Sequence, residues 1–281
     1  MGDKFSSLEW LPDLVDRTEQ PVQHRSRNFE VLSSLRRGLT VVLDALFPHS
    51  CPVCNELVQC DGGLCLSCWQ TLELISAPYC ERLGVPLHYD LGPNAWSAAA
   101  LVNPPDYDRA RAAVLYNGPA RELVKRFKFY GEVRLSRFLA KCMLNAGAEL
   151  VSLESFLVPV PLHRSRLRQR TYNQSALLVK EIGHHLGGRV LLDGMVRTRK
   201  THQQVGLKRG ARTANVGGAF HVAEHFLPLV SGAHVVLVDD VLTTGATVEE
   251  CARVLKAAGA RQVDVLVFAL VDPENFSADN G

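Results

Sequence analysis

Residues 235–247 read VVLVDDVLTTGAT and combine a predicted strand, an acidic pair and a short polar loop. The four apolar residues predict a buried strand of a parallel sheet, which places Asp239 and Asp240 at its carboxyl end, where open α/β sheets bind ligands. Two adjacent carboxylates can accept hydrogen bonds from the vicinal hydroxyls of a ribose. The loop 243–247 supplies hydroxyls and backbone N–H groups at the start of a helix, which favours a phosphate. The run therefore predicts a site for a ribose phosphate.

A helix is predicted directly after this loop, over residues 248–258. Thr247 is the expected N-cap, and Glu250 stands three residues later, as in a capping box. Gly259 occupies the position where a helix commonly ends in a left-handed conformation. Gly245 lets the backbone of the loop approach a bound phosphate closely. No GxxxxGK[ST] run is present and no GxGxxG run follows a strand, so the sequence predicts neither a P-loop nor a dinucleotide-binding fold.

Strands and helices alternate over most of the chain. We predict strands over residues 109–116, 156–160, 219–222, 234–238 and 263–271, helices over residues 120–130, 135–150 and 174–186, a loop over residues 161–173, and loop with strand over residues 91–105. Because the predicted strands are almost wholly apolar, we expect an α/β fold in which helices cover both faces of a parallel sheet.

The composition excludes several classes of protein. The chain has 281 residues, 47% of them hydrophobic and 21% charged, with a formal net charge of +2. This balance is ordinary for a globular protein and provides no global positive field for nucleic acid. The longest apolar stretches are far shorter than a membrane span, and the N-terminus lacks the features of a signal peptide. We therefore expect a cytoplasmic protein.

The length accommodates one large domain and a small one. Residues 1–46 are predicted to form a polar tail and an amphipathic helix, because apolar residues recur at helical spacing from Phe29 to Phe47. Residues 47–90 are rich in cysteine and are expected to form a small metal-binding module. Residues 91–281 carry the alternating pattern and are expected to form the α/β domain.

Six of the eight cysteines lie between Cys51 and Cys80, within the expected metal module. Four of them form two C-x2-C pairs separated by ten residues: Cys51, Cys54, Cys65 and Cys68. Two such pairs are typical of a structural zinc site with four thiolate ligands. Buried free thiols and an iron–sulfur cluster are the alternatives. Cys60 and Cys80 remain, and either could substitute as a ligand.

Two segments are rich in arginine. Residues 158–170, VPVPLHRSRLRQR, follow a predicted strand. The candidates there for contact with a second anionic group are Pro161, His163 and Arg164, and a solvated surface is the alternative. Residues 197–215 form a long basic segment without predicted structure, which is either a flexible linker or a lid over a ligand. Arg197 begins this segment and is a further candidate contact.

The run 235–247 resembles the signature of the type I phosphoribosyltransferases at all thirteen positions. The resemblance implies that the ligand is phosphoribosyl pyrophosphate and that Asp239 and Asp240 face its ribose. The residues implied for the 5′-phosphate are Thr243, Thr244, Gly245, Ala246 and Thr247. A Mg²⁺ ion held mostly by oxygens of the ligand would accompany it. In related transferases a flexible loop at the chain position of Arg197 and Gln203-Gln204 closes over the ligand.

The chain from about Phe47 onward resembles the ComF-like proteins, which are associated with DNA uptake in competent bacteria. The matching runs are the cysteine module, DRARAAVLYNGPARELVKRFKFYGE, VPVPLHRSRLRQRTYNQSA, QQVGLKRGARTANVGGAF and the run 235–247. The resemblance implies a small N-terminal zinc ribbon joined to a type I phosphoribosyltransferase-like domain. The family usually carries a third knuckle, CxxCG, where this chain has Cys80 and Gly84 but Leu83 in place of the second cysteine. Thr171 likewise replaces the glycine of the family's Arg-Gly-Phe-Asn-Gln run.

Two hypotheses on function follow. The first is a protein that binds phosphoribosyl pyrophosphate and transfers its phosphoribosyl group to a nitrogenous acceptor with release of pyrophosphate, the acceptor pocket being built from residues 98–130. The second is a non-enzymatic accessory of DNA uptake that binds single-stranded DNA or protein partners of the competence machinery and only senses the metabolite. The basic segments lack the interleaved aromatic residues expected of a stacking surface for single strands.

Overall fold

The computed structural model describes residues 49–59, 62–170, 172–186, 189–199 and 217–272. The tail and helix predicted over residues 1–47 lie outside these ranges, as do Cys60 and most of the segment predicted as a linker or lid. By their contacts, the residues from His49 onward form one compact unit.

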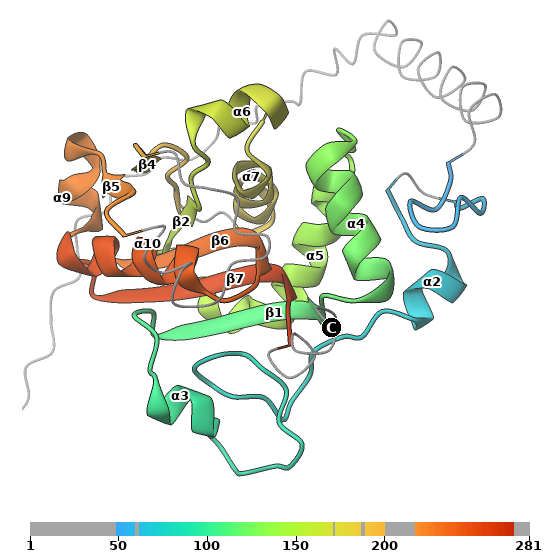
Figure 1. The fold of residues 1–281 in the computed structure, drawn as a ribbon, viewed down its shortest axis with the longest axis horizontal. Helices are drawn as coiled ribbons and strands as arrows, with labels where there is room; N and C mark the ends of the chain where they lie inside the picture. Colours follow the sequence, from blue (N-terminus) through green and yellow to red (C-terminus); the bar gives the residue numbers. More distant parts are fainter. Residues whose placement is uncertain (1–48, 60–61, 171, 187–188, 200–216, 273–281) are drawn as a thin grey trace, which may run out of the picture. The chain divides into compact units, whose positions relative to one another are not determined.

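A five-stranded, wholly parallel sheet lies at the centre of this unit (Figure 1). In spatial order its strands are β1 (Arg109–Leu115), β7 (Gln262–Leu270), β6 (His234–Leu242), β2 (Phe156–Pro159) and β3 (Arg189–Val190). The central strands are apolar almost throughout, which is the pattern of a sheet buried on both faces. The predicted parallel α/β fold is confirmed.

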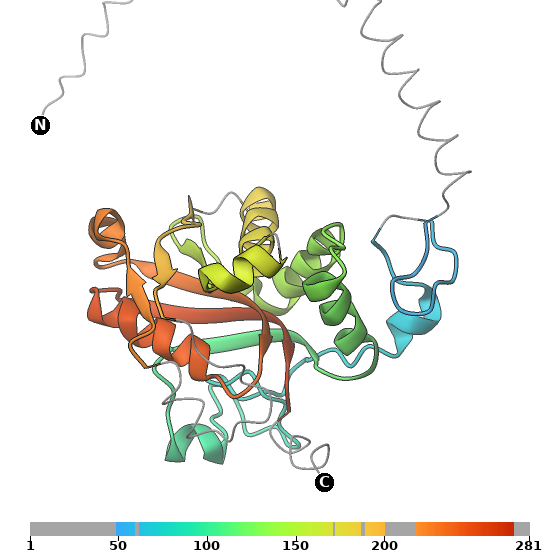
Figure 2. The same cartoon turned by 45° about the horizontal axis from the view of Figure 1, so that its top comes forward.

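Helices cover both faces of the sheet. The four longer ones are α4 (Gly118–Phe129), α5 (Leu135–Gly147), which continues into a 3-10 turn at Ala148–Leu150, α7 (Gln174–Leu186) and α10 (Ala246–Ala257). Side chains alternate along β6, so that Val236 and Val238 pack in one core with α4, α5 and α7, while Val235 and Leu237 pack in another with α10. Figures 1 and 2 show α10 (orange-red) on the opposite side of β6 and β7 from α5 and α7.

A small antiparallel pair of strands accompanies the main sheet. It consists of β4 (Met195–Arg197) and β5 (Phe220–Val222), and β5 is followed by a 3-10 turn (Glu224–Phe226) and α9 (Leu227–Val230). The strand predicted over residues 219–222 is therefore confirmed. Strand β4 ends at Arg197 and β5 begins at Phe220. The two strands therefore lie on either side of the segment that the sequence predicts as a linker or lid.

Two short helices occupy segments that the sequence predicts differently. Helix α6 (Arg164–Arg170) lies in the predicted loop 161–173, and α3 (Ala98–Val102) lies where loop and strand are predicted. Both predictions are wrong for the same reason. Each helix has no more than two turns and no apolar period, and it begins at a side chain that accepts a backbone N–H: the ring of His163 for α6 and the hydroxyl of Ser97 for α3.

The start of α10 also differs from the prediction. The helix begins at Ala246, and Gly245 stands at the N-cap with a φ of +82°, so Thr247 is not the N-cap. Glu250 does not close a capping box, because its carboxylate accepts the N–H of Gly218 at 2.7 Å and binds Arg253. The predicted end is confirmed, since Gly259 has a φ of +97° just beyond the last turn.

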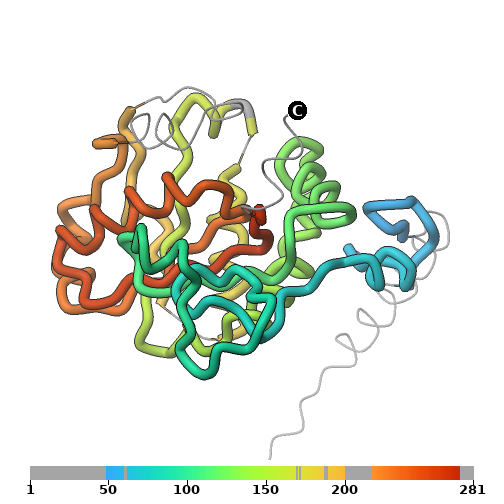
Figure 3. The backbone as a smooth tube through the Cα atoms, turned by 60° about the horizontal axis from the view of Figure 1, so that its bottom comes forward, coloured from blue at the N-terminus to red at the C-terminus, as the bar shows by residue number. Residues whose placement is uncertain are grey.

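The described residues before β1 form two hairpins and two short helices. The first hairpin leads into α2 (Leu66–Gln70) and the second into α3. Figure 3 follows the chain from the first hairpin (blue) through residues 73–107 (cyan to green) into β1. The ring of Trp69 packs edge-on against Phe138 of α5 with centroids 5.8 Å apart, which attaches α2 to the α/β domain.

Candidate functional site

The acidic pair lies near the carboxyl end of β6, just beyond the point at which the neighbouring strand β2 ends. Pro159 pairs in register with Val238, and the N–H of Val160 donates to the carbonyl of Val238 at 3.0 Å. The loop that begins at Pro161 therefore leaves the sheet beside Asp239. The register thus brings two of the segments that the sequence singles out to one edge of the sheet.

Asp239 is oriented by helix α7. The hydroxyl of Ser175 donates to Oδ1 of Asp239 at 2.8 Å, and the N–H of Asp240 donates to the same oxygen at 2.9 Å. Asn173 fixes the start of α7, because its Oδ1 accepts the N–H of Ser175 and its Nδ2 donates to the carbonyl of Val160. Oδ1 of Asp239 is thereby held, whereas no hydrogen bond to Oδ2 is found among the described residues.

Asp240 is buried and forms an ion pair with helix α4. The Nζ of Lys128, in the last turn of α4, lies 2.8 Å from Oδ1 of Asp240. The backbone carbonyl of Lys128 in turn accepts the side-chain amide of Gln174 at 3.3 Å, and the hydroxyl of Tyr172 donates to the carbonyl of Phe127 at 3.0 Å. The ends of α4 and α7 are therefore fastened together beside the acidic pair.

The two carboxylates have different surroundings. Burial and the negative charge of Asp240 raise the pKa of Asp239 to about 7, against the opposing effects of Lys128 and of the hydrogen bond from Ser175. Near neutral pH, both the protonated and the ionised form of Asp239 are therefore populated. It can accept a hydrogen bond from a hydroxyl when ionised and donate one when protonated.

The loop between β6 and α10 has the features of a phosphate cradle. The φ of +82° at Gly245 favours glycine, and a Cβ there would lie 3.2 Å from Oε1 of Glu249. Ala246 is buried and begins a helix of twelve residues, so its N–H lies at the positive end of the helix dipole. Thr243 is exposed and Thr247 half-buried. The Oγ1 of Thr244 is buried and has no hydrogen-bond partner in the part of the chain described.

The residues of the arginine-rich segment are divided between the site and the surface. Pro161 is buried at the end of β2, and the Nδ1 of His163 accepts the N–H of Ser165 at 3.2 Å, so this histidine caps α6. Arg164 is exposed at the start of α6. Arg166 of the same helix, which the sequence does not single out, is half-buried, and burial together with the charge of Arg170 lowers its pKa.

Arg197 ends β4 and is buried. Its guanidinium carbon lies 5.0 Å from the centroid of the Phe220 ring. Burial lowers its pKa, and so does the charge of Arg166, whereas Asp239 raises it. Arg197 therefore lies within electrostatic reach of both Arg166 and Asp239. Gln203 and Gln204, which the sequence assigns to a closing loop, are outside the described residues.

Lys128 and Ser175 belong to the site but are not among the residues that the sequence predicts for it. Both lie in runs that carry the family resemblance, but neither has a local pattern that marks it as a ligand contact. Ser175 is 64 residues away from Asp239 in the chain, so only the packing of α7 on β6 brings them together. The arrangement places two carboxylates, the loop before α10, the buried Arg197 and the half-buried Arg166 near the carboxyl edge of the sheet.

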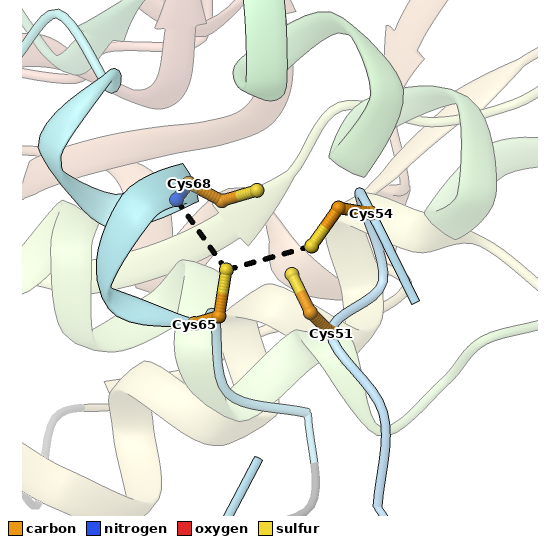
Figure 4. A group of neighbouring side chains, drawn as sticks. All are labelled: Cys51, Cys54, Cys65 and Cys68. Carbon is orange, nitrogen blue, oxygen red and sulfur yellow. Dashed lines mark hydrogen bonds between the residues drawn. The ribbon is translucent and has the colours of Figure 1, made fainter. Parts of the chain in front are cut away.

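The predicted metal centre is present as a cluster of thiols (Figure 4). Its ligand atoms all lie within 4.8 Å of one another, and they belong to Cys51, Cys54, Cys65 and Cys68. The Sγ atoms of Cys54 and Cys65 are 3.5 Å apart. Tetrahedral zinc with bonds of about 2.3 Å requires sulfurs separated by about 3.8 Å, so the cluster fits zinc with small adjustments.

The thiol of Cys51 has a lowered pKa, which favours the thiolate form that binds metals. Burial raises its pKa, but hydrogen bonds from backbone N–H groups of Cys54, Cys65 and Val53 outweigh this and lower it to about 6. Cys80 is buried apart from this cluster, and its Sγ accepts the N–H of Ser97 at 3.1 Å. Among the described residues, Cys80 therefore does not replace a ligand of the four-cysteine site.

Within the described ranges, no helix is both long enough and apolar enough to cross a membrane.

Comparison with known proteins matches two parts of the chain to known domains. Residues 42–99 match the double zinc ribbon domain, and residues 174–275 match the phosphoribosyl transferase domain. Competence protein F of Haemophilus influenzae is 30% identical over 211 residues, which cover 73% of this chain and 89% of that protein. DNA utilization protein YhgH of Escherichia coli K12 is 32% identical over 220 residues (76% and 87%). Competence protein ComFC of Bacillus subtilis is 26% identical over 221 residues (76% and 86%).

Proposed function

Because the chain belongs to the family of competence protein F and DNA utilization protein YhgH, we propose that it binds phosphoribosyl pyrophosphate at the carboxyl edge of its sheet. The observation that carries the proposal is the acidic pair of β6 placed directly before the loop of Thr244 and Gly245. This arrangement offers carboxylates to two neighbouring hydroxyls and, within the same short run of the chain, a helix start to a phosphate.

Each group of residues has a separate part in binding. The free oxygen of Asp239 and the carboxylate of Asp240 accept hydrogen bonds from the ribose hydroxyls, and Lys128 holds Asp240 in place. The buried hydroxyl of Thr244 and the N–H groups at the start of α10 bind the 5′-phosphate. The pyrophosphate lies toward Arg197 and the loop 161–163, with His163 and Arg164 at its margin.

The proposed reaction transfers the phosphoribosyl group to a nitrogenous acceptor. The acceptor nitrogen forms a bond to C1 of the ribose while the bond from C1 to the pyrophosphate oxygen breaks, and pyrophosphate leaves with the bonding electrons. A proton then passes from the acceptor nitrogen to water. Mg²⁺ bound to the pyrophosphate oxygens, with Asp239 or Asp240 available as protein ligands, would neutralise the charge of the leaving group. Helix α4, part of the expected acceptor region 98–130, reaches the acidic pair through Lys128.

Calorimetric titration with phosphoribosyl pyrophosphate and Mg²⁺ tests the binding. We expect wild type to bind, and the double variant Asp239→Asn, Asp240→Asn to bind at least about tenfold more weakly, since two charge-assisted hydrogen bonds are lost. Asp106→Asn is the matched control, because this exposed carboxylate precedes β1 at the opposite edge of the sheet. Absence of binding by wild type would contradict the proposal.

Release of pyrophosphate tests the transfer. Wild type loaded with zinc would be incubated with the same ligand and a panel of nitrogen acceptors: ammonia, purine bases, pyrimidine bases and nicotinate. Pyrophosphate formed with one acceptor, and lost in the double variant, supports the transferase. Binding without pyrophosphate release for any member of the panel supports a protein that only senses the metabolite.

A second candidate function, binding of single-stranded DNA, is favoured by a surface at the end of α4. Phe129 and Tyr130 are 68% and 64% exposed. The guanidinium of Arg170 lies 5.0 Å from the Phe129 ring centroid, and the Nζ of Lys125 lies 5.7 Å from that of Tyr130. The arginine-rich segments 158–170 and 197–215 contain no aromatic residues, but Phe129 and Tyr130 belong to the run KRFKFY (125–130), and folding brings Arg170 of α6 beside Phe129. Aromatic rings flanked by cations are suited to stacked bases and phosphates.

Titration of a fluorescent oligothymidylate tests this candidate. We expect the double variant Phe129→Ala, Tyr130→Ala to bind about tenfold more weakly than wild type, and binding to weaken as salt increases. Tyr89→Ala is the matched control, since Tyr89 is a similarly exposed aromatic residue outside α4. Equal affinities of wild type and the double variant would exclude this surface as the binding site.

A further inference from the structure

The first half of the zinc ribbon, residues 49–71, begins with a hairpin around Cys51. The N–H of this cysteine donates to the carbonyl five residues later at 2.7 Å, and the N–H four residues later donates back to the cysteine carbonyl at 2.9 Å. An antiparallel bridge joins the residue before the cysteine to the residue six after it. Asn55, the fourth residue after the cysteine, has a φ of 64°. This turn presents the sulfurs of Cys51 and Cys54 to one metal site.

The hairpin around Cys80 repeats these backbone features. The N–H of Cys80 donates to the carbonyl five residues later at 2.8 Å, and the N–H four residues later donates back at 2.7 Å. The antiparallel bridge again joins the residue before the cysteine to the residue six after it. Gly84, the fourth residue after the cysteine, has a φ of 69°. The backbone around Cys80 is therefore that of a zinc knuckle.

The short helices that follow the hairpins are also equivalent. Cys65 is the N-cap of α2 with φ −68° and ψ 161°, and its Sγ accepts the N–H of Cys68. Ser97 is the N-cap of α3 with φ −68° and ψ 155°, and its Oγ accepts the N–H of Ala100. Both helices are five residues long. The second pair of ligands in the first half thus has a counterpart in the second half, residues 78–103.

The correspondence identifies what stands at the second metal site. The positions of Cys51, Cys54, Cys65 and Cys68 are occupied in the second half by Cys80, Leu83, Ser97 and Ala100. Only the first of these offers a thiolate, and its sulfur already accepts the N–H of Ser97. Ala100 is fully buried, and Leu83 packs against one core of the sheet. Such a set cannot hold zinc, which needs four strong ligands.

The match of residues 42–99 to a double zinc ribbon implies two metal sites, and the structure disagrees with the second. We propose that residues 78–103 are a zinc-ribbon half that folds without metal, so that this chain binds one zinc ion, at the four cysteines of the first half. The second half retains the backbone of a knuckle, and other contacts replace the bonds to the metal.

Arg111 of β1 supplies the main replacement. Its buried guanidinium forms an ion pair with the carboxylate of Glu81, donates to the carbonyl of Glu81 at 2.8 Å and binds Glu149 at 2.7 Å. Its Cζ lies 4.4 Å from the ring centroid of Tyr79, the residue before Cys80. Arg111 therefore attaches the residues on either side of Cys80 to the sheet.

Close backbone contact completes the attachment. The N–H of Ala110 donates to the carbonyl of Arg82 at 2.9 Å, and a Cβ on Gly84 would lie only 2.5 Å from the carbonyl oxygen of Ala110. The guanidinium of Arg82 donates to the carbonyl of Pro105 at 2.9 Å and lies 5.1 Å from the Trp96 ring centroid. The second half is thus packed on β1, which removes the need for a metal to stabilise it.

Zinc content per chain tests the proposal. Elemental analysis of the full chain, purified with excess zinc and then desalted, should give one zinc ion per chain for wild type. The variants Cys80→Ser and Cys60→Ser should give the same value, and Cys51→Ser should lose it. Two zinc ions per wild-type chain, or a loss of zinc in Cys80→Ser, would overturn the proposal.

Restoring the missing ligands tests the correspondence itself. The triple variant Leu83→Cys, Ser97→Cys, Ala100→Cys should raise the content to two zinc ions per chain, and should double the absorbance of the tetrahedral thiolate complex when cobalt replaces zinc. A folded triple variant that still binds one ion would overturn the assignment of these positions. If the triple variant does not fold, the zinc content of wild type and of Cys80→Ser still decides between one site and two.

Discussion

The buried hydroxyl of Thr244 has no hydrogen-bond partner within the described part of the chain, and this makes it a sensitive probe of the proposed phosphate site. An unsatisfied buried polar group destabilises the fold. Thr244→Val should therefore leave the free energy of unfolding unchanged or raise it by up to about 1 kcal/mol, while weakening the binding of phosphoribosyl pyrophosphate about tenfold. Chemical denaturation and calorimetry measure the two effects. Loss of stability without loss of affinity would contradict a role in phosphate binding.

The raised pKa of Asp239 makes stability depend on pH. A carboxyl group whose pKa rises on folding, here to about 7, contributes stability that is present at low pH and is lost as the pH rises through that value. Asp239→Asn keeps an acceptor for Ser175 but removes the charge. The free energy of unfolding of Asp239→Asn relative to wild type should therefore increase by about 2 kcal/mol as the pH is raised from 5 to 8. This is less than the full pKa shift implies, because Asp239 is half-buried.

Urea denaturation at both pH values measures this gain, with Asp106→Asn as the exposed control. A stability difference between Asp239→Asn and wild type that is the same at pH 5 and pH 8 would contradict the raised pKa. A gain for both variants would point to the net charge of the chain as the cause.

At the scale of elements, the ion pair of Lys128 and Asp240 joins α4 to the acidic pair of β6. Lys128→Met keeps the aliphatic stem but leaves Asp240 buried without a counter-ion. We expect a loss of about 2–3 kcal/mol in the free energy of unfolding. Lys125→Met is the matched control, since Lys125 is exposed on the same helix, 3.6 Å from Glu122, and should cost less than about 0.5 kcal/mol. Adding Asp240→Asn to Lys128→Met should recover much of the loss, and no recovery would show that the pair is not the cause.

The elements that the sequence predicts correctly are those whose pattern is local. The apolar runs of β6 and β7 and the periodic faces of α5 and α7 appear where they are expected, because burial on a sheet requires those patterns. Helix α6 is missed because Leu167 is its only apolar residue, and the ring of His163 that caps it is recognisable only in three dimensions. The start of α10 is misplaced because Gly245 and Thr247 are both acceptable N-caps, and the turn after β6 selects the glycine.

The candidate site divides in the same way. Asp239, Asp240 and the loop before α10 are contiguous, so one run of sequence predicts their arrangement. Lys128 and Ser175 come from other helices, and their distance from the acidic pair depends on how α4 and α7 pack on the sheet. The four thiols are predicted because knuckle spacing is local too, whereas the fate of the second half depends on Arg111, which follows the ribbon in the chain.

At the scale of the whole molecule, removal of zinc should unfold the first half of the ribbon and leave the α/β domain folded. The first half is held by four thiols and a few apolar contacts, including the packing of Trp69 on Phe138. Treatment with a chelator should therefore abolish the protection of amides in residues 49–71 from hydrogen exchange, while β6 and β7 remain protected. Mass spectrometry of exchanged peptides measures this. Loss of protection throughout the sheet would contradict it, and re-addition of zinc should restore the first half.

The segment that links the two ribbon halves has a further consequence. Residues 73–75 run along the free edge of β1: the N–H of Ile75 donates to the carbonyl of Ala113, and the N–H of Leu115 donates to the carbonyl of Glu73, each at 2.9 Å. A chain shortened to begin at Leu91 would leave that edge strand uncovered and ready to pair with another molecule. Light scattering should show that it associates with increasing concentration. The linker between the halves thus also protects the sheet against aggregation.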